Sequence, residues 1–132
     1  MEEEPNIEDL KSKLTFGVKF WLEFEGESIM GSGWANLLRT IQENEDGSLT
    51  QASEECGYSY KYAWNILKRI ETRTGMSPVS TGKGGSGGGG WVKLNEWGSY
   101  LIETYDLLEQ ELRQKEAEIR RTLKEYRKKS HD

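Results

Sequence analysis

The sequence has little of what most catalytic and metal sites require, because its 132 residues include only one cysteine and one histidine. The lone Cys56 excludes an intrachain disulfide and a cysteine-based zinc site, and it is typical of a small buried residue in a reducing cytosol. His131 stands next to the terminus, and no pair of carboxylates lies in an apolar setting that would separate their pKa values. We therefore expect a non-enzyme with no metal and no cofactor.

Long hydrophobic runs are also absent. No apolar stretch approaches the roughly 18 residues that a membrane span needs. Residues 1–5 are acidic, whereas a secretory signal begins with basic residues and continues with apolar ones. These features predict a cytoplasmic protein without a membrane partner.

The sequence is net acidic, but one internal segment is strongly basic. The net charge is −5, yet residues 58–93 contain six basic residues and one acidic residue, a charge of +5 that leaves −10 for the remainder. A nonspecific nucleic-acid coat would be basic over its whole surface. The pattern instead favours a protein that binds with one face.

Residues 59–74 predict an amphipathic helix that begins at a Ser59 cap. Its apolar residues recur at three- and four-residue spacing, the period of one helical face: Ala63, Ile66, Leu67 and Ile70. The opposite face is polar and basic, with Lys61, Asn65, Lys68 and Thr72 at its centre and Arg69 and Arg73 toward one flank. These side chains suit groove reading and phosphate pairing, although an ordinary solvated face is the alternative.

A short helix is predicted over residues 49–56, directly before this one. Ser48 stands at the cap position and Gln51 follows three residues later, the spacing of a capping box, while Gly57 ends the helix. A short helix, a glycine-containing turn and a longer helix form a helix-turn-helix, in which the second helix enters the major groove.

A glycine-rich hairpin, or wing, is predicted over residues 79–94. Residues 79–81 read as extended, nine residues dominated by glycine follow, and residues 91–94 return as a strand. Such a wing commonly contacts the DNA backbone, and its tip here carries Lys83. Residues 82–87 also match G-x-G-x-x-G, but a strand follows where a nucleotide site needs a helix, so nucleotide binding is not expected.

Residues upstream of the helix-turn-helix predict a hairpin and one further helix. Alternation from Phe16 to Phe24 indicates a strand with one buried face, Glu25-Gly26 a tight turn, and Ser28 to Met30 a partner strand. Residues 34–41 then have helical periodicity. The fold class is therefore α+β: a winged helix-turn-helix with an N-terminal β-hairpin and a long C-terminal helix.

The long helix is predicted from Glu96 toward Lys129, with Asn95 as its cap. Apolar residues follow a heptad seam that Lys115 and Thr122 interrupt, which predicts a short coiled coil between two chains: Leu101, Tyr105, Leu108, Leu112, Ile119 and Tyr126. A solvated arm, or a helix packed back on its own domain, is the alternative. The expected organisation is an acidic N-terminal segment (1–14), a winged helix (15–95) and a dimerisation helix (96–132).

Several of these stretches together resemble the amino-terminal DNA-binding domain of the ModE family of molybdate-responsive regulators, a LysR-like winged helix. The resemblance covers roughly residues 15–110. It rests on Gly-Ser-Leu, Gly-Tyr-Ser-Tyr-Lys-Tyr-Ala-Trp, Gly-Lys-Gly-Gly with its glycine tail, and the segment that opens the long helix, at residues 47–49, 57–64, 82–85 and 98–105. It implies a homodimer that binds operator DNA.

The sequence also departs from this family. The wing has extra glycines and Ser86, and Asn95 follows Leu94 where the family usually has threonine. The sequence stops after the long helix, without the molybdate-binding domains of the full regulators. The resemblance therefore supports DNA binding, and no molybdate binding is expected.

We thus expect a sequence-specific, dimeric, double-stranded DNA-binding protein that acts in transcription. Lys61 and Asn65 are the candidates for base edges. Candidates for phosphate contacts are Ser48, Gln51, Ser59, Tyr60, Lys68, Arg69 and Lys83.

The alternatives are a winged-helix protein-interaction module and a single-strand or RNA binder. The alternating aromatics at residues 58–64 would form a base-stacking platform on a strand, but on a helix they scatter, which favours packing against the wing or a neighbouring helix.

Overall fold

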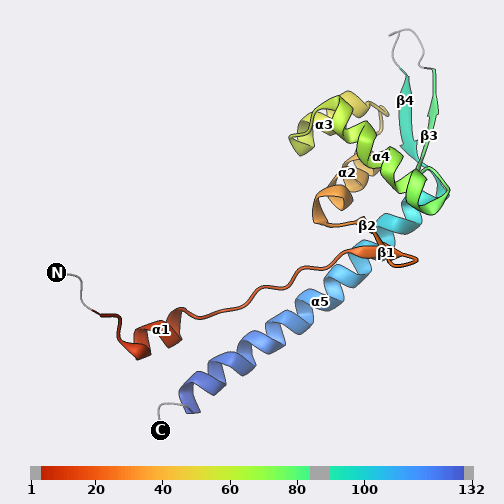
Figure 1. Ribbon diagram of the computed structural model, residues 1–132. Helices are drawn as coiled ribbons and strands as arrows, with labels where there is room; N and C mark the ends of the chain where they lie inside the picture. The colour runs from red at the N-terminus through yellow and green to blue at the C-terminus, as the bar shows by residue number, and fades with distance from the viewer. Residues whose placement is uncertain (1–3, 84–89, 130–132) are drawn as a thin grey trace. The chain divides into compact units, whose positions relative to one another are not determined.

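The computed structural model describes residues 4–83 and 90–129, and its helices and short strands follow the order expected for an α+β fold (Figure 1). The described elements are α1 (Ile7–Lys13), β1 (Leu22–Phe24), β2 (Glu27–Met30), α2 (Ser32–Glu43), α3 (Leu49–Cys56), α4 (Tyr60–Thr74), β3 (Val79–Gly82), β4 (Trp91–Leu94) and α5 (Glu96–Lys129). The predicted winged helix, with an N-terminal hairpin and a long C-terminal helix, is confirmed.

The chain divides into two compact units. Phe20–Leu108 forms one, here called the central unit; Met1–Lys19 and Glu109–Asp132 form the other, the terminal unit. Among the described residues, no helix offers a segment long and apolar enough to cross a membrane.

The N-terminal hairpin is shorter than the sequence predicts. Antiparallel pairing joins β1 to β2 through a turn at Glu25 and Gly26, both of which have positive φ angles. The strand predicted from Phe16 begins only at Leu22, because β2 supplies backbone partners for three residues of β1. The predicted alternation nevertheless holds, since side chains from Phe16 to Phe24 alternate between half-buried and exposed.

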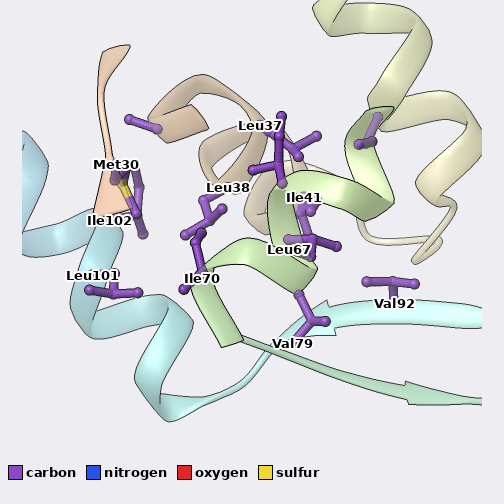
Figure 2. Packing of buried hydrophobic residues seen from close by; sticks show 14 of the residues in the cluster. Met30, Leu37, Leu38, Ile41, Leu67, Ile70, Val79, Val92, Leu101 and Ile102 are labelled. Atoms are coloured by element: carbon purple, nitrogen blue, oxygen red, sulfur yellow. The ribbon is translucent and has the colours of Figure 1, made fainter. Parts of the chain in front are cut away.

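The core of the central unit gathers aliphatic side chains from α2, α4, α5 and both hairpins (Figure 2). The apolar face predicted for α4 is buried throughout: Ala63, Ile66, Leu67 and Ile70. Leu38 and Ile41 of α2 and Ile102 of α5 belong to the same core. Because this burial uses one side of α4, the other side remains available for contacts outside the chain.

Helices α3 and α4 are defined at both ends by the residues that the sequence indicates. Ser48 Oγ accepts a hydrogen bond from the Gln51 N–H at 3.1 Å, and Ser59 Oγ accepts one from the Tyr62 N–H at 3.0 Å. Each helix ends at a left-handed glycine, with φ of 75° at Gly57 and 86° at Gly75. The predicted helix-turn-helix is therefore present.

The long helix α5 begins at the predicted cap, where Asn95 Oδ1 accepts a hydrogen bond from the Gly98 N–H at 2.9 Å. A Cβ at Gly98 would stand 2.0 Å from the Pro78 carbonyl oxygen, so only glycine permits this close approach to the start of the wing. The buried residues of α5 in the central unit include Leu101 and Tyr105. The Tyr105 ring stacks on the Phe20 ring, with ring centres 4.5 Å apart.

Within the terminal unit, the later part of α5 contacts the chain that follows α1. Arg113 donates a hydrogen bond to the Val18 carbonyl at 3.2 Å, and Arg120 donates to Thr15 Oγ1 at 3.1 Å. The Arg120 guanidinium also lies 4.7 Å from the centre of the Phe16 ring, a cation–π contact. The alternative of a helix that packs against its own chain thus describes part of α5.

Candidate nucleic-acid interface

The outer face of α4 carries the polar and basic side chains that the helical period predicts. Lys61, Asn65, Lys68 and Arg69 are all exposed, on the side opposite the buried apolar residues. Lys68 Nζ lies 3.5 Å from Glu71 Oε1, but their side chains are 69% and 41% exposed. An ion pair this open is weak, so Lys68 can exchange Glu71 for a phosphate at small cost.

Arg73, on the flank of the same helix, has a different role. Its guanidinium donates a hydrogen bond to the Ser28 carbonyl of β2. This contact holds the end of α4 against the N-terminal hairpin. The basic side chains of α4 therefore divide into one that fixes the helix and others that face outward.

The other predicted contact residues are spread along the amino ends of the two helices. Ser59 and Tyr60 are exposed at the start of α4. Ser48 is half-buried, and its hydroxyl oxygen caps α3. Gln51 is exposed, but it lines an open hollow, here called the acidic hollow, together with Glu43, Asn44, Glu45, Asp46 and Glu55. A phosphate at Gln51 would meet these carboxylates.

The wing is firmly attached to the helix-turn-helix. The β3–β4 register pairs Val79 with Leu94 and Gly82 with Trp91, and Val79 and Val92 are buried in the core. The Val92 N–H donates to the Gly47 carbonyl at 2.9 Å, which ties β4 to the turn before α3. Lys83 is exposed directly after β3, whereas the rest of the glycine motif, residues 84–87, lies outside the described residues.

An open groove of about 550 Å³ lies between the amino ends of α3 and α4 and the facing parts of β3 and β4. We call it the wing groove; its lining includes Asp46, Ser48, Thr50, Tyr60, Trp64, Thr81 and Trp91. Trp91 and Thr81 were not predicted as contact residues from the sequence. The sequence offers only their position as an indication: the tryptophan directly follows a glycine-rich run, and the threonine directly precedes it.

The remaining aromatics of the helix-turn-helix pack against each other and against α2. Tyr58 and Tyr62 meet edge to face with ring centres 4.9 Å apart, and a Cβ at Gly33 would stand 2.8 Å from the Tyr58 hydroxyl. Burial raises the pKa of Tyr58, and the neighbouring Tyr62 and Cys56 raise it further. Tyr58 is therefore a neutral packing residue.

No acidic, histidine or cysteine cluster suited to a metal ion occurs in residues 4–83 and 90–129. The exposed polar groups of α4 and the wing include ammonium, guanidinium, amide and hydroxyl donors. Donors of this kind, spread over a convex helix and an adjacent hairpin, can pair with a polyanion and with base edges.

Comparison with known proteins found regulators, and no family model matches the chain. The chain is 40% identical over 72 residues to the transcriptional regulator ModE of Yersinia pestis, which covers 54% of this chain and 26% of that protein. It is 41% identical over 64 residues to the DNA-binding transcriptional dual regulator ModE of Escherichia coli K12, covering 48% and 24%. With the molybdenum-pterin-binding protein MopB of Rhodobacter capsulatus it shares 35% identity over 80 residues, covering 61% and 28%.

The matched region thus spans about a quarter of the length of these curated relatives. Over about half of the present chain, the resemblance to ModE regulators inferred from the motifs is confirmed.

Proposed function

We propose that this protein is a sequence-specific, double-stranded DNA-binding regulator of transcription, with α4 in the major groove and the wing, residues 79–94, on the backbone. The observation that carries the proposal is the outer face of α4, where exposed Lys61, Asn65 and Lys68 stand opposite a fully buried apolar face. The similarity to proteins named as transcriptional regulators supports it.

Within this function, the side chains of α4 divide the tasks. Asn65 can form two hydrogen bonds with adenine, and Lys61 can donate to guanine, so both are base readers. Phosphate contacts that orient the protein come from exposed residues around them: Ser59, Tyr60, Lys68, Arg69 and Lys83. Ser48 and Gln51 are weaker candidates, because Ser48 is half-buried, unlike Ser59, and Gln51 lies among carboxylates.

A selection of bound sequences from a random duplex pool tests the proposal, followed by titration of the selected duplex at two salt concentrations. We expect a recurring sequence whose affinity falls as salt rises, since each phosphate contact releases counterions. Asn65→Ala should relax the preference at one position and leave the others unchanged. Absence of duplex binding at low salt would contradict DNA binding and favour a protein-interaction module, and stronger binding to unpaired strands would favour a single-strand binder.

We further propose that two copies associate through the terminal unit. Apolar side chains that are 43% to 69% exposed occur on α1 and α5 of this unit and directly after α1: Ile7, Leu10, Leu14, Ile119 and Tyr126. Exposed apolar groups in one small unit favour burial against a partner. Leu101 and Tyr105 are buried in the core of the central unit, so they are not free to form a seam, while Leu108 is 40% exposed.

Light scattering over a range of protein concentrations tests this association. A dimer is expected, and Ile119→Glu should shift it toward monomer by placing a charge in the apolar contact. Leu107→Glu, on the central-unit part of α5, is the matched control and should leave the dimer unchanged. A parent protein that stays monomeric at high concentration would exclude the proposed pairing.

We also propose a cytoplasmic location, a non-catalytic role, and no molybdate site in the described part of the chain. Carboxylates line the acidic hollow, and they would repel an oxyanion. Molybdate is therefore expected to leave the melting temperature unchanged, and a rise that saturates with molybdate concentration would contradict this.

A further inference from the structure

The wing groove brings three aromatic rings together at the edge of the proposed DNA-binding face. Tyr60 and Trp64 come from the start of α4, and Trp91 begins β4. Tyr60 is 50% exposed and Trp91 is 36% exposed. Large rings that are left open beside a binding face are typical of contact surfaces, because covering them removes much apolar area from water.

Trp91 is held in a defined position by two glycines. Its ring lies over Gly82, where an added Cβ would stand 2.5 Å from ring atoms, and a Cβ at Gly47 would stand 3.0 Å from the Trp91 Cβ. The hydrogen bond from the Val92 N–H to the Gly47 carbonyl fixes the backbone beside it. Trp91 is therefore directed at the groove by the fold, in contrast to a tryptophan that is exposed by chance.

Charge and hydroxyl groups around the rings indicate what the groove would bind. Lys61 and Lys83 are exposed on the helix and the wing that border the groove, although neither lines it. Thr50 and Thr81 line the groove with hydroxyl groups, which can donate to phosphate oxygens. The Asp46 carboxylate, near the amino end of α3, also lines the groove and would repel a phosphate.

Tyr60 and Trp64 are poorly arranged for stacking on successive unpaired bases. Tyr60 and Trp64 have ring centres 6.3 Å apart and planes inclined by 77°. A single-strand platform needs ring faces that successive bases can cover. A sugar, by contrast, has apolar carbons that can pack against a ring without requiring parallel ring faces.

We infer that the wing groove receives the sugar–phosphate backbone of one strand of duplex DNA, with Trp91 and Tyr60 against deoxyribose and Thr81 directed at a phosphate. The inference rests on the proposed DNA-binding function. It assigns to Trp91 a share of the affinity that does not come from charge, and to Gly82 the role of positioning the Trp91 ring.

The salt dependence of binding separates this contact from an ionic one. Trp91→Ala should weaken binding of the selected duplex about three- to tenfold, by loss of apolar contact area, and leave the slope of log affinity against log salt unchanged. Lys83→Ala is the matched control on the same wing, and its slope should decrease by about one because one phosphate contact is lost. Trp91→Phe should retain most of the affinity, and Gly82→Ala should reproduce the Trp91→Ala loss by displacing the ring.

Protection of the ring provides a readout that does not depend on a mutant's affinity. Quenching of tryptophan fluorescence by acrylamide should decrease when duplex is added to the parent, and this decrease should be smaller in Trp91→Phe. Equal melting temperatures of parent and variants show that the fold is retained.

The outcomes distinguish the inference from the function on which it rests. No duplex binding by the parent contradicts the proposed function. A parent that binds duplex while Trp91→Ala and Gly82→Ala bind equally well overturns only the inference, as does a Trp91→Ala loss confined to unpaired strands. A Trp91→Ala variant that lowers the salt slope as Lys83→Ala does would overturn the apolar contact and indicate an ionic one.

Discussion

Helices α3 and α4 are built by the same local means and expose opposite charges. In both, a serine caps the first turn and a left-handed glycine ends the helix. Helix α3 has the sequence LTQASEEC, with two carboxylates and no cation, whereas α4 carries Lys61, Lys68, Arg69 and Arg73 against Glu71. Capping and core contacts therefore make both segments helical, and the exposed residues decide which helix can approach a polyanion.

The acidic hollow sharpens this difference. It places Glu43, Glu45 and Asp46 from the end of α2 and the following turn beside Gln51 and Glu55 of α3. Carboxylates repel phosphates over about 10 Å at 0.1 M salt. We therefore expect these carboxylates to disfavour a phosphate backbone beside α3, although Asp46 also lines the wing groove.

The largest effect is expected on the buried sides, where the two helices should behave alike. Leu67 of α4 and Leu49 of α3 are 1% and 4% exposed. Replacing either by alanine should lower the free energy of unfolding by about 2–5 kcal/mol, the cost of lost contacts and a cavity. Urea unfolding monitored by circular dichroism measures this.

The exposed Lys61→Ala is the control for stability, and it should change the free energy of unfolding by less than about 0.5 kcal/mol. A loss confined to Leu67→Ala would show that α3 contributes little to the core and would remove the structural equivalence of the two helices.

Charge reversal on the exposed faces should have a nearly as large effect, but on DNA affinity, and the effect should differ between the two helices. Lys61→Glu removes a proposed base contact and introduces repulsion, so the affinity for the selected duplex should fall about a hundredfold, or about 2.7 kcal/mol. Glu54→Lys, the matched reversal on α3, should strengthen binding slightly and equally for all sequences. Fluorescence anisotropy with selected and scrambled duplexes measures both.

If Glu54→Lys changed the preferred sequence and Lys61→Glu did not, α3 would be the reading helix. That result would contradict the assignment of α4 to the major groove and leave DNA binding itself intact.

Removing either serine cap should destabilise the protein by a similar amount. Ser48→Ala and Ser59→Ala each remove one hydrogen bond to a first-turn N–H, so each should cost about 1 kcal/mol of stability. Only Ser59→Ala should also weaken duplex binding, by about twofold to fivefold, because Ser59 adjoins the proposed phosphate contacts. Equal loss of affinity in both variants would show that the Ser48 hydroxyl contacts the DNA as well.

Local chemistry made most of this fold predictable from the sequence. The caps at Ser48, Ser59 and Asn95 and the ends at Gly57 and Gly75 occur where side-chain and glycine preferences indicate, because those preferences act within one turn. The period of α4 likewise identified its buried face. These features depend on residues close to each other in the sequence.

Features that depend on distant partners were missed or misjudged. The strand at Phe16 was predicted too long, because its length depends on how many residues β2 offers as partners. Leu101 and Tyr105 fit a heptad seam, yet they pack against Phe20 and the rest of the central core. The wing groove joins residues from α3, α4 and both wing strands, so no single stretch of sequence reveals it.

The smallest effect is expected from neutralising one carboxylate of the acidic hollow. Glu55→Gln removes a negative charge beside Gln51 without changing the shape of the side chain, so binding of the selected duplex should become about twofold tighter. The gain should shrink as salt rises from about 50 to about 200 mM, because exposed charges are screened. Glu103→Gln on α5 is the isosteric control and should leave the affinity unchanged. Glu103 lines neither the wing groove nor the acidic hollow. If Glu55→Gln weakened binding instead, the α3 carboxylate would itself be accepting a hydrogen bond from a base, most simply the amino group of cytosine, and the charge difference between the two helices would no longer identify the DNA-binding side.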